Sequence, residues 1–166
     1  IAIKFVNEVS KNSNRKITFN VVGKETVQSN EIIDKFKNVL NFKLNVTGYI
    51  SDSDLYHFYA KSKYILCFSH SEGFGLTVVE AASFKVFPLL SDLPIFHELT
   101  NNSLFYYSHN AKDINEFTEK FFSIEGNSFE NEYTQSLESM VEKYYDMYKT
   151  SAKKINKVLS SINNWN

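Results

Sequence analysis

The chain has 166 residues, of which 43% are hydrophobic and 22% are charged, and its formal net charge is -1. This composition is typical of a globular domain, and the nearly neutral charge excludes the strongly basic surface with which many proteins bind nucleic acid. The single cysteine, Cys67, excludes an internal disulfide and a cysteine-based zinc cluster.

Apolar runs and helical patterns alternate along the chain. In chain order the patterns predict a helix over residues 1–9, a strand over 17–22, a helix over 32–40, a strand over 42–46, a helix from 51, a strand over 64–68, a helix over 76–84, strands over 86–90 and 104–107, and a helix around 114–121. Because apolar strands alternate with helices, we predict an α/β fold, a Rossmann-like, doubly wound parallel sheet with helices on both faces. Ligands of such sheets bind beyond the carboxyl ends of the strands, so the residues that follow each strand are the candidates for a site.

The C-terminal part has a different pattern, since no glycine or proline occurs from Ser128 onward. Apolar side chains recur at helical spacing at positions 129, 133, 137, 140, 141, 144 and 148 and predict one or two long helices packed on the sheet. We therefore divide the chain into a sheet domain over residues 1–125 and a helical extension over residues 126–166. Lys153, Lys154 and Lys157 make the extension basic, which predicts a solvated helix face or, alternatively, contact with a membrane surface.

The segment that points to chemistry is residues 69–80, SHSEGFGLTVVE, between a predicted buried strand and a predicted helix. Gly73 and Gly75 let the backbone approach a ligand closely, because they carry no Cβ atom. The first amides of the next helix are unpaired and lie at the positive end of its dipole, which suits a phosphate. Glu72 and Glu80 would repel a phosphate, so we interpret them as hydrogen-bond acceptors for sugar hydroxyls at either end of a diphosphate. A purely structural strand-to-helix turn is the alternative.

Residues 72–81, EGFGLTVVEA, resemble the E-x7-E signature of retaining GT-B glycosyltransferases, in the large group often called family 4 or group 1. The specific features are the two glutamates with seven residues between them, the Gly-Phe-Gly turn and the apolar helix that follows. Flanking segments resemble the family in the same order, namely residues 21–23, 46–50, 55–68 and 91–94. The resemblance covers residues 1–122 and implies that the sheet domain is the C-terminal, donor-binding domain of such an enzyme.

The resemblance also implies a role for each candidate site residue. Glu72 would be the catalytic carboxylate that meets the donor sugar, together with the backbone of Gly73 and Phe74. Glu80 would accept hydrogen bonds from the nucleotide ribose. The remaining donor-binding residues would act largely through their backbone: Gly75, Leu76 and Thr77 at the diphosphate, Tyr49 and Ile50 at the base, and Gly23 at the wall of the cleft.

The reaction implied by the resemblance is transfer of a sugar from a UDP- or GDP-linked donor to a glycan, lipid or protein acceptor, with retention at the anomeric carbon. A front-face mechanism is implied, with no metal, no other cofactor and no nucleic-acid partner. We expect a cytoplasmic enzyme of bacterial polysaccharide biosynthesis, with contact at the inner face of the membrane as a further expectation. The acceptor-binding domain and a basic Arg–Lys pair would precede Ile1, where the first predicted helix lacks a cap, so we expect the chain alone to bind donor but to turn it over poorly.

Two departures from the family pattern leave alternatives open. Lys85 and Phe87 stand where the family has a glycine and then a proline, which favours a degenerate, non-catalytic partner module. A nucleotide-sugar epimerase on the same scaffold is a third hypothesis, against which the spacing of the two glutamates argues. Residues 52–54, Asp-Ser-Asp, fit a D-x-D metal pattern, but Ser51 and Asp54 also fit a helix cap, which we prefer.

Overall fold

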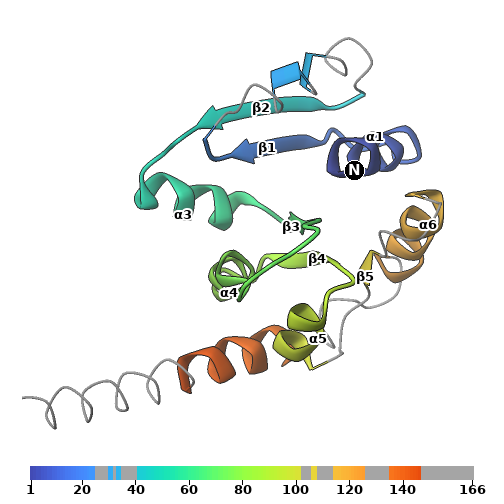
Figure 1. The fold of residues 1–166 in the computed structure, drawn as a ribbon. Coiled ribbons are helices and arrows are strands. Elements are labelled where there is room, and N and C mark those ends of the chain that lie inside the picture. The colour runs from blue at the N-terminus through green and yellow to red at the C-terminus, as the bar shows by residue number, and fades with distance from the viewer. Residues whose placement is uncertain are drawn as a thin grey trace, which may run out of the picture.

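The computed structural model describes residues 1–24, 30–31, 33–34, 41–101, 106–107, 114–125 and 135–146 (Figure 1). The labelled helices are α1 (Ala2–Lys11), α3 (Asp52–Lys61), α4 (Leu76–Ser83), α5 (Pro94–Thr100) and α6 (Ile114–Glu125). The strands are β1 (Thr18–Val22), β2 (Lys43–Gly48), β3 (Tyr64–Cys67), β4 (Phe87–Ser91) and β5 (Tyr106–Tyr107). Residues 30–31, 33–34 and 135–146 are also helical. Most predicted elements are confirmed to within two residues, whereas the helix predicted over 32–40 lies largely outside the described residues.

The strand pairs are parallel, as the alternation of strands and helices predicts. β1 pairs with β2, with Thr18 opposite Lys43, and β3–β4–β5 form a second sheet. The amide of Phe87 donates to the carbonyl of Lys63 at 2.9 Å at the start of β4. Because proline has no N–H group, Phe87 supplies a sheet hydrogen bond that the family's proline would lack.

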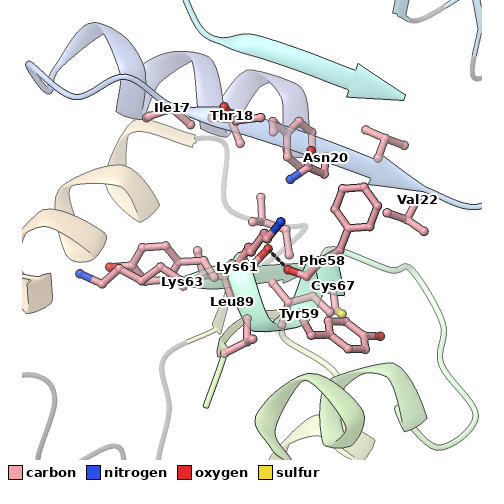
Figure 2. Close-up of a pocket in the computed structure, with 18 of the residues that line it drawn as sticks. Ile17, Thr18, Asn20, Val22, Phe58, Tyr59, Lys61, Lys63, Cys67 and Leu89 are labelled. Carbon is pink, nitrogen blue, oxygen red and sulfur yellow. Dashed lines mark hydrogen bonds between the residues drawn. The ribbon is translucent and has the colours of Figure 1, made fainter. Parts of the chain in front are cut away.

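The five described strands form two parallel sheets, one of two strands and one of three. Among these strands, β1 pairs with β2 alone, and β3 pairs with β4 alone, so one edge of each is left without a strand partner. Both strands line a common cavity, and the ring of Phe58 on α3 points into it toward β1 (Figure 2). This cavity, rather than a backbone ladder, therefore lies between β1 and β3.

The hydrophobic core is centred on β4, where every residue is buried. Leu89 is 1% exposed and Leu90 is 0% exposed, because helices pack on both faces of this strand. α4 contributes Val78 and Val79, and α5 contributes Phe96. Truncating a leucine at such a position to alanine typically lowers the free energy of unfolding by about 2–5 kcal/mol. The buried strand β4 is therefore a stable support for α4, whose first turn lies at the candidate site.

An aromatic cluster joins α1 to α6 at the opposite side of the core. The ring of Phe5 on α1 lies edge-on to three rings, at centroid distances of 5.7 Å from Phe68, 5.1 Å from Phe117 and 5.6 Å from Phe121. α1 begins at Ile1 without a side-chain cap, as predicted. Its stability therefore comes from packing of this apolar face rather than from its first turn.

The helix at residues 135–146 packs on the sheet domain, as the helical stripe predicts. Leu137 and Met140 are buried in the main core, and Nζ of Lys143 donates to the carbonyl of Glu98 at the end of α5 at 2.6 Å. The boundary at residue 125/126 stays a prediction, and the lysines at 153, 154 and 157 lie outside the described residues. In the part of the chain that is described, no helix is long and apolar enough to span a membrane.

Candidate functional site

Three segments follow the carboxyl ends of strands and converge on one side of the fold. Gly23 follows β1 with a φ of 134°, a backbone conformation that side chains disfavour, and its amide donates to the carbonyl of Gly48 at 3.0 Å. Tyr49 and Ile50 follow β2, and Tyr49 is 87% exposed. The Gly-Phe-Gly loop follows β3. This is the arrangement from which α/β proteins build ligand sites.

A cavity of about 910 Å³ lies between the two sheets and reaches these segments. Its volume is in the range of pockets that hold small molecules. The predicted site residues that line it are Gly23, Tyr49, Ile50, Thr77 and Glu80. Figure 2 shows Ile17 and, on β1, Thr18, Asn20 and Val22 above the cavity, with Phe58 and Tyr59 of α3 below it. Residues 72–76, the other predicted ones, are not part of its lining: residues 72–75 lie in the adjoining loop and Leu76 begins α4.

The Gly-Phe-Gly loop turns its amides toward a carboxylate of its own. Oε1 of Glu72 accepts hydrogen bonds from the amide of Gly73 at 3.0 Å and from the amide of Gly75 at 3.3 Å. Glu72 itself is exposed. Two amides of this loop thus point at the same anionic oxygen, which is the geometry of an anion-binding nest.

Gly75 makes the turn into α4 possible. It is the N-cap of α4 with φ 80° and ψ 33°, in the left-handed region, and its carbonyl accepts from the amides of Val78 and Val79. A Cβ atom at this position would lie 3.1 Å from Cε1 of Phe96 on α5. Only glycine satisfies both the dihedral angles and the packing, so Gly75 has a structural role in addition to the predicted close approach to a ligand.

The side chains of Phe74 and Leu76 face the C-terminal helix rather than the large cavity. The ring of Phe74 lies 5.4 Å from the ring of Tyr144. Leu76 lines a second, apolar pocket of about 340 Å³ together with Val79, Tyr144 and Tyr145. In the sequence, Tyr144 is one of several apolar residues at helical spacing. Nothing in that pattern indicates that its ring contacts Phe74 of the Gly-Phe-Gly loop.

Glu80 is exposed on α4 and is contacted from α3. Oη of Tyr59 donates a long hydrogen bond to Oε2 of Glu80 at 3.4 Å. Tyr59 is only 5% exposed, and burial, followed by the charge of Glu80, raises the pKa of its hydroxyl well above the ordinary value. The apolar pattern of this helix gives no signal for a polar contact, so the hydrogen bond from Tyr59 to Glu80 is a feature of the candidate site that sequence reasoning missed.

The turn after α4 closes although Lys85 replaces the family's glycine. The amide of Lys85 donates to the carbonyl of Ala82 at 2.8 Å, and the amide of Val86 donates to the carbonyl of Ala81 at 3.1 Å. These are the two hydrogen bonds of a Schellman motif, and Lys85 adopts the left-handed φ of 61° that the motif requires. The departure in sequence therefore leaves the local backbone intact.

The remaining polar features near the site have structural explanations. Oγ of Ser51 accepts from the amide of Asp54 at 3.2 Å, which confirms the predicted cap of α3. Burial, followed by the nearby charge of Glu72, raises the pKa of the Cys67 thiol to about 12, so this thiol is not a nucleophile at neutral pH. Within the described ranges, no group of three or more His, Cys, Asp or Glu side chains could hold a metal ion.

An ionic cluster closes the cavity at the amino ends of the strands, opposite the candidate site. Oε1 of Glu125 accepts from Oη of Tyr64 at 2.8 Å and from Nη1 of Arg15 at 2.5 Å, and Nζ of Lys63 lies 3.6 Å away. Burial opposes ionisation of Glu125, but these hydrogen bonds and the two positive charges outweigh it and lower its pKa. The cluster ties α6 to β3 and to the segment before β1, so its role is structural.

Comparisons with known proteins identify a family for this chain. The profile of the family described as "Glycosyl transferases group 1" matches residues 1–143. Two Escherichia coli sequences named "Serotype-specific mannosyltransferase WbdA" are 33% and 34% identical over 107 and 93 residues, which is 63% and 55% of this chain. The matched part spans only 13% and 11% of those relatives.

Solved structures are similar in fold. The crystal structure of a GtfA/B complex superposes with a TM-score of 0.68 at 18% identity, over 86% of this chain and 29% of that one. The pneumococcal O-GlcNAc transferase GtfA in complex with UDP and GlcNAc gives a TM-score of 0.61 at 19% identity, over 93% of this chain and 32% of that one. These likenesses confirm the Rossmann-like α/β fold predicted from the sequence.

Proposed function

The chain belongs to the group 1 glycosyltransferases, and from this premise we propose that it is the donor-binding part of a glycosyltransferase and binds a nucleoside diphosphate sugar. The observation that carries the proposal is that Glu80 and Thr77 line the same cavity as Gly23, Tyr49 and Ile50, which follow the carboxyl ends of β1 and β2. The donor would lie across this edge, with its base near β2 and its ribose near α4.

The Gly-Phe-Gly loop and the start of α4 would hold the diphosphate. Gly75 leaves its amide and those of Leu76 and Thr77 at the positive end of α4, and the exposure of Leu76 and Thr77 keeps them accessible. The attraction of the loop amides for the carboxylate of Glu72 supports this assignment, because a phosphate oxygen would make the same type of contact. Glu72 would exchange these amides for hydroxyls of the donor sugar when the diphosphate binds.

The reaction would be transfer of the sugar with retention at the anomeric carbon, to a glycan, lipid or protein acceptor. The contribution of this part would be electrostatic, since amides aimed at the departing diphosphate stabilise the charge that develops there. The identity of the sugar is left to experiment, because the relatives are named mannosyltransferases whereas the similar GtfA structure holds UDP and GlcNAc. Lys85 and Phe87 keep the turn after α4 and a sheet hydrogen bond in place. A degenerate, non-catalytic module is the alternative, and nucleotide binding distinguishes the two.

Nuclear magnetic resonance tests where a nucleotide binds. UDP, GDP and ADP are each titrated into ¹⁵N-labelled chain while the backbone amide resonances are followed. We expect one of them to cause saturable shifts of the amides of Gly73, Gly75 and Thr77, whereas the amides of α6 stay unchanged. Shifts that avoid the Gly-Phe-Gly loop, or no saturable shifts with any of the three, would argue against the proposal.

A further inference from the structure

Tyr59 is held rigidly at the junction of α3 and α4. Its ring is buried with Ala81 and Val86, at the end of α4 and in the turn that follows, and Ile65 of β3 packs against the same group. The ring of Phe84 lies 5.8 Å away and covers another side. A side chain packed on several sides in this way has one position for its hydroxyl group.

Glu80 has the opposite character. It lies on the exposed surface of α4 and carries a long side chain, whose rotational freedom is lost when a ligand immobilises it. The hydroxyl of Tyr59 reaches its Oε2 at 3.4 Å, and both residues line the large cavity. A carboxylate accepts about four hydrogen bonds, so the bond from Tyr59 leaves Glu80 able to accept two more from a ligand.

The hydroxyl of Tyr59 is a constant donor. Its pKa is raised by burial and then by the charge of Glu80, so it keeps its proton throughout the physiological pH range. In this structure the carboxylate of Glu80 accepts the hydrogen bond of the Tyr59 hydroxyl, so this hydroxyl does not need an acceptor from a ligand. A fixed donor on one side of a carboxylate orients the other lone pairs, and preorganisation of this kind increases affinity by reducing the entropy lost on binding.

We propose that Tyr59 is a positioning residue of the nucleotide site, whose hydroxyl holds the carboxylate of Glu80 in the orientation that accepts hydrogen bonds from the ribose. The inference rests on the proposed function, in which Glu80 is the ribose acceptor. It adds that the affinity for ribose depends on α3, a helix that the loop signature does not include.

The test compares ribose discrimination in variants of the 166-residue chain. Dissociation constants are measured by calorimetry for UDP, GDP and ADP, and then for the 2′-deoxy and 3′-deoxy forms of the nucleotide that binds. We expect the chain to prefer the ribose form by about tenfold or more, because a hydrogen bond to a charged group contributes this much. In Tyr59→Phe the preference should fall by roughly threefold or more, while the melting temperature changes little.

Tyr64→Phe is the matched control, since it removes a hydroxyl that donates to Glu125 at 2.8 Å at the opposite end of the strands. It should lower stability without changing ribose discrimination. The inference is overturned if Glu80→Gln abolishes ribose discrimination but Tyr59→Phe retains it, or if Tyr59→Phe weakens ribose and deoxyribose forms equally. The proposed function itself fails if none of the three nucleotides binds, or if Glu80→Gln binds the ribose form as tightly as the unaltered chain.

Discussion

Replacing Gly75 by alanine tests the argument that the turn into α4 requires glycine. The left-handed φ of 80° costs an L-residue about 1–2 kcal/mol. The new Cβ atom would also lie 3.1 Å from Cε1 of Phe96, a fully buried ring, and such overpacking costs about 1–3 kcal/mol. The free energy of unfolding should therefore fall by about 2–5 kcal/mol, which for a chain of this size lowers the melting temperature by roughly 5–15 °C.

Gly73→Ala is the matched control, because nothing lies within 4 Å of a Cβ atom at that position and its φ is not in the left-handed region. Urea and thermal unfolding, followed by circular dichroism, should show a change of less than about 0.5 kcal/mol for Gly73→Ala. Equal stabilities of the two variants would refute the reasoning, since both carry the same added methyl group within the same loop.

Three further predictions follow from the described contacts. Lys85→Gly should raise the free energy of unfolding by about 1 kcal/mol, because it relieves a left-handed φ of 61° on an exposed residue, whereas Lys85→Ala should be neutral in the same urea titration. Glu125→Gln should lower stability by about 1–2 kcal/mol at pH 7. The pKa of Glu125 in the folded chain lies below its unfolded value, so its carboxylate stabilises the fold above pH ~4.5, and this stabilisation is lost as the pH falls through the folded pKa. If Glu125→Gln were still less stable than the unaltered chain by the same amount at pH 3, this reasoning would be contradicted. Tyr144→Ala should weaken nucleotide binding severalfold by releasing Phe74, and Tyr144→Phe should not; equal affinities in calorimetry would exclude this support of the loop.

The strands and the loop could be predicted because their signals are local. The apolar run before residue 69 predicts β3, and the glycines with the helix after them predict the turn into α4. α5 was not predicted, since it is only seven residues long and its only start signal is Pro94 at the first helical position. Short helices of this kind depend on packing, here of Phe96, which a single sequence does not display.

The contacts that connect distant segments could not be predicted from the sequence. Tyr59 and Glu80 lie 21 positions apart, and Phe74 and Tyr144 lie in segments separated by several elements. The sequence around these four residues shows only that they lie on helices or in a loop; it does not show that Tyr59 donates to Glu80 or that the rings of Phe74 and Tyr144 are in contact.

Calorimetric titration of the chain and of Glu80→Ala with UDP, GDP and ADP tests the central claim most directly. Glu116→Gln, an exposed glutamate on α6 outside the cavity lining, is the control for the loss of a negative charge. We predict that one nucleotide binds, that Glu80→Ala weakens its binding by tenfold or more, and that Glu116→Gln leaves it unchanged, since a hydrogen bond to a charged group contributes about 1.5–3 kcal/mol. Equal affinities of Glu80→Ala and the unaltered chain, or no binding of any of the three nucleotides, would contradict the account.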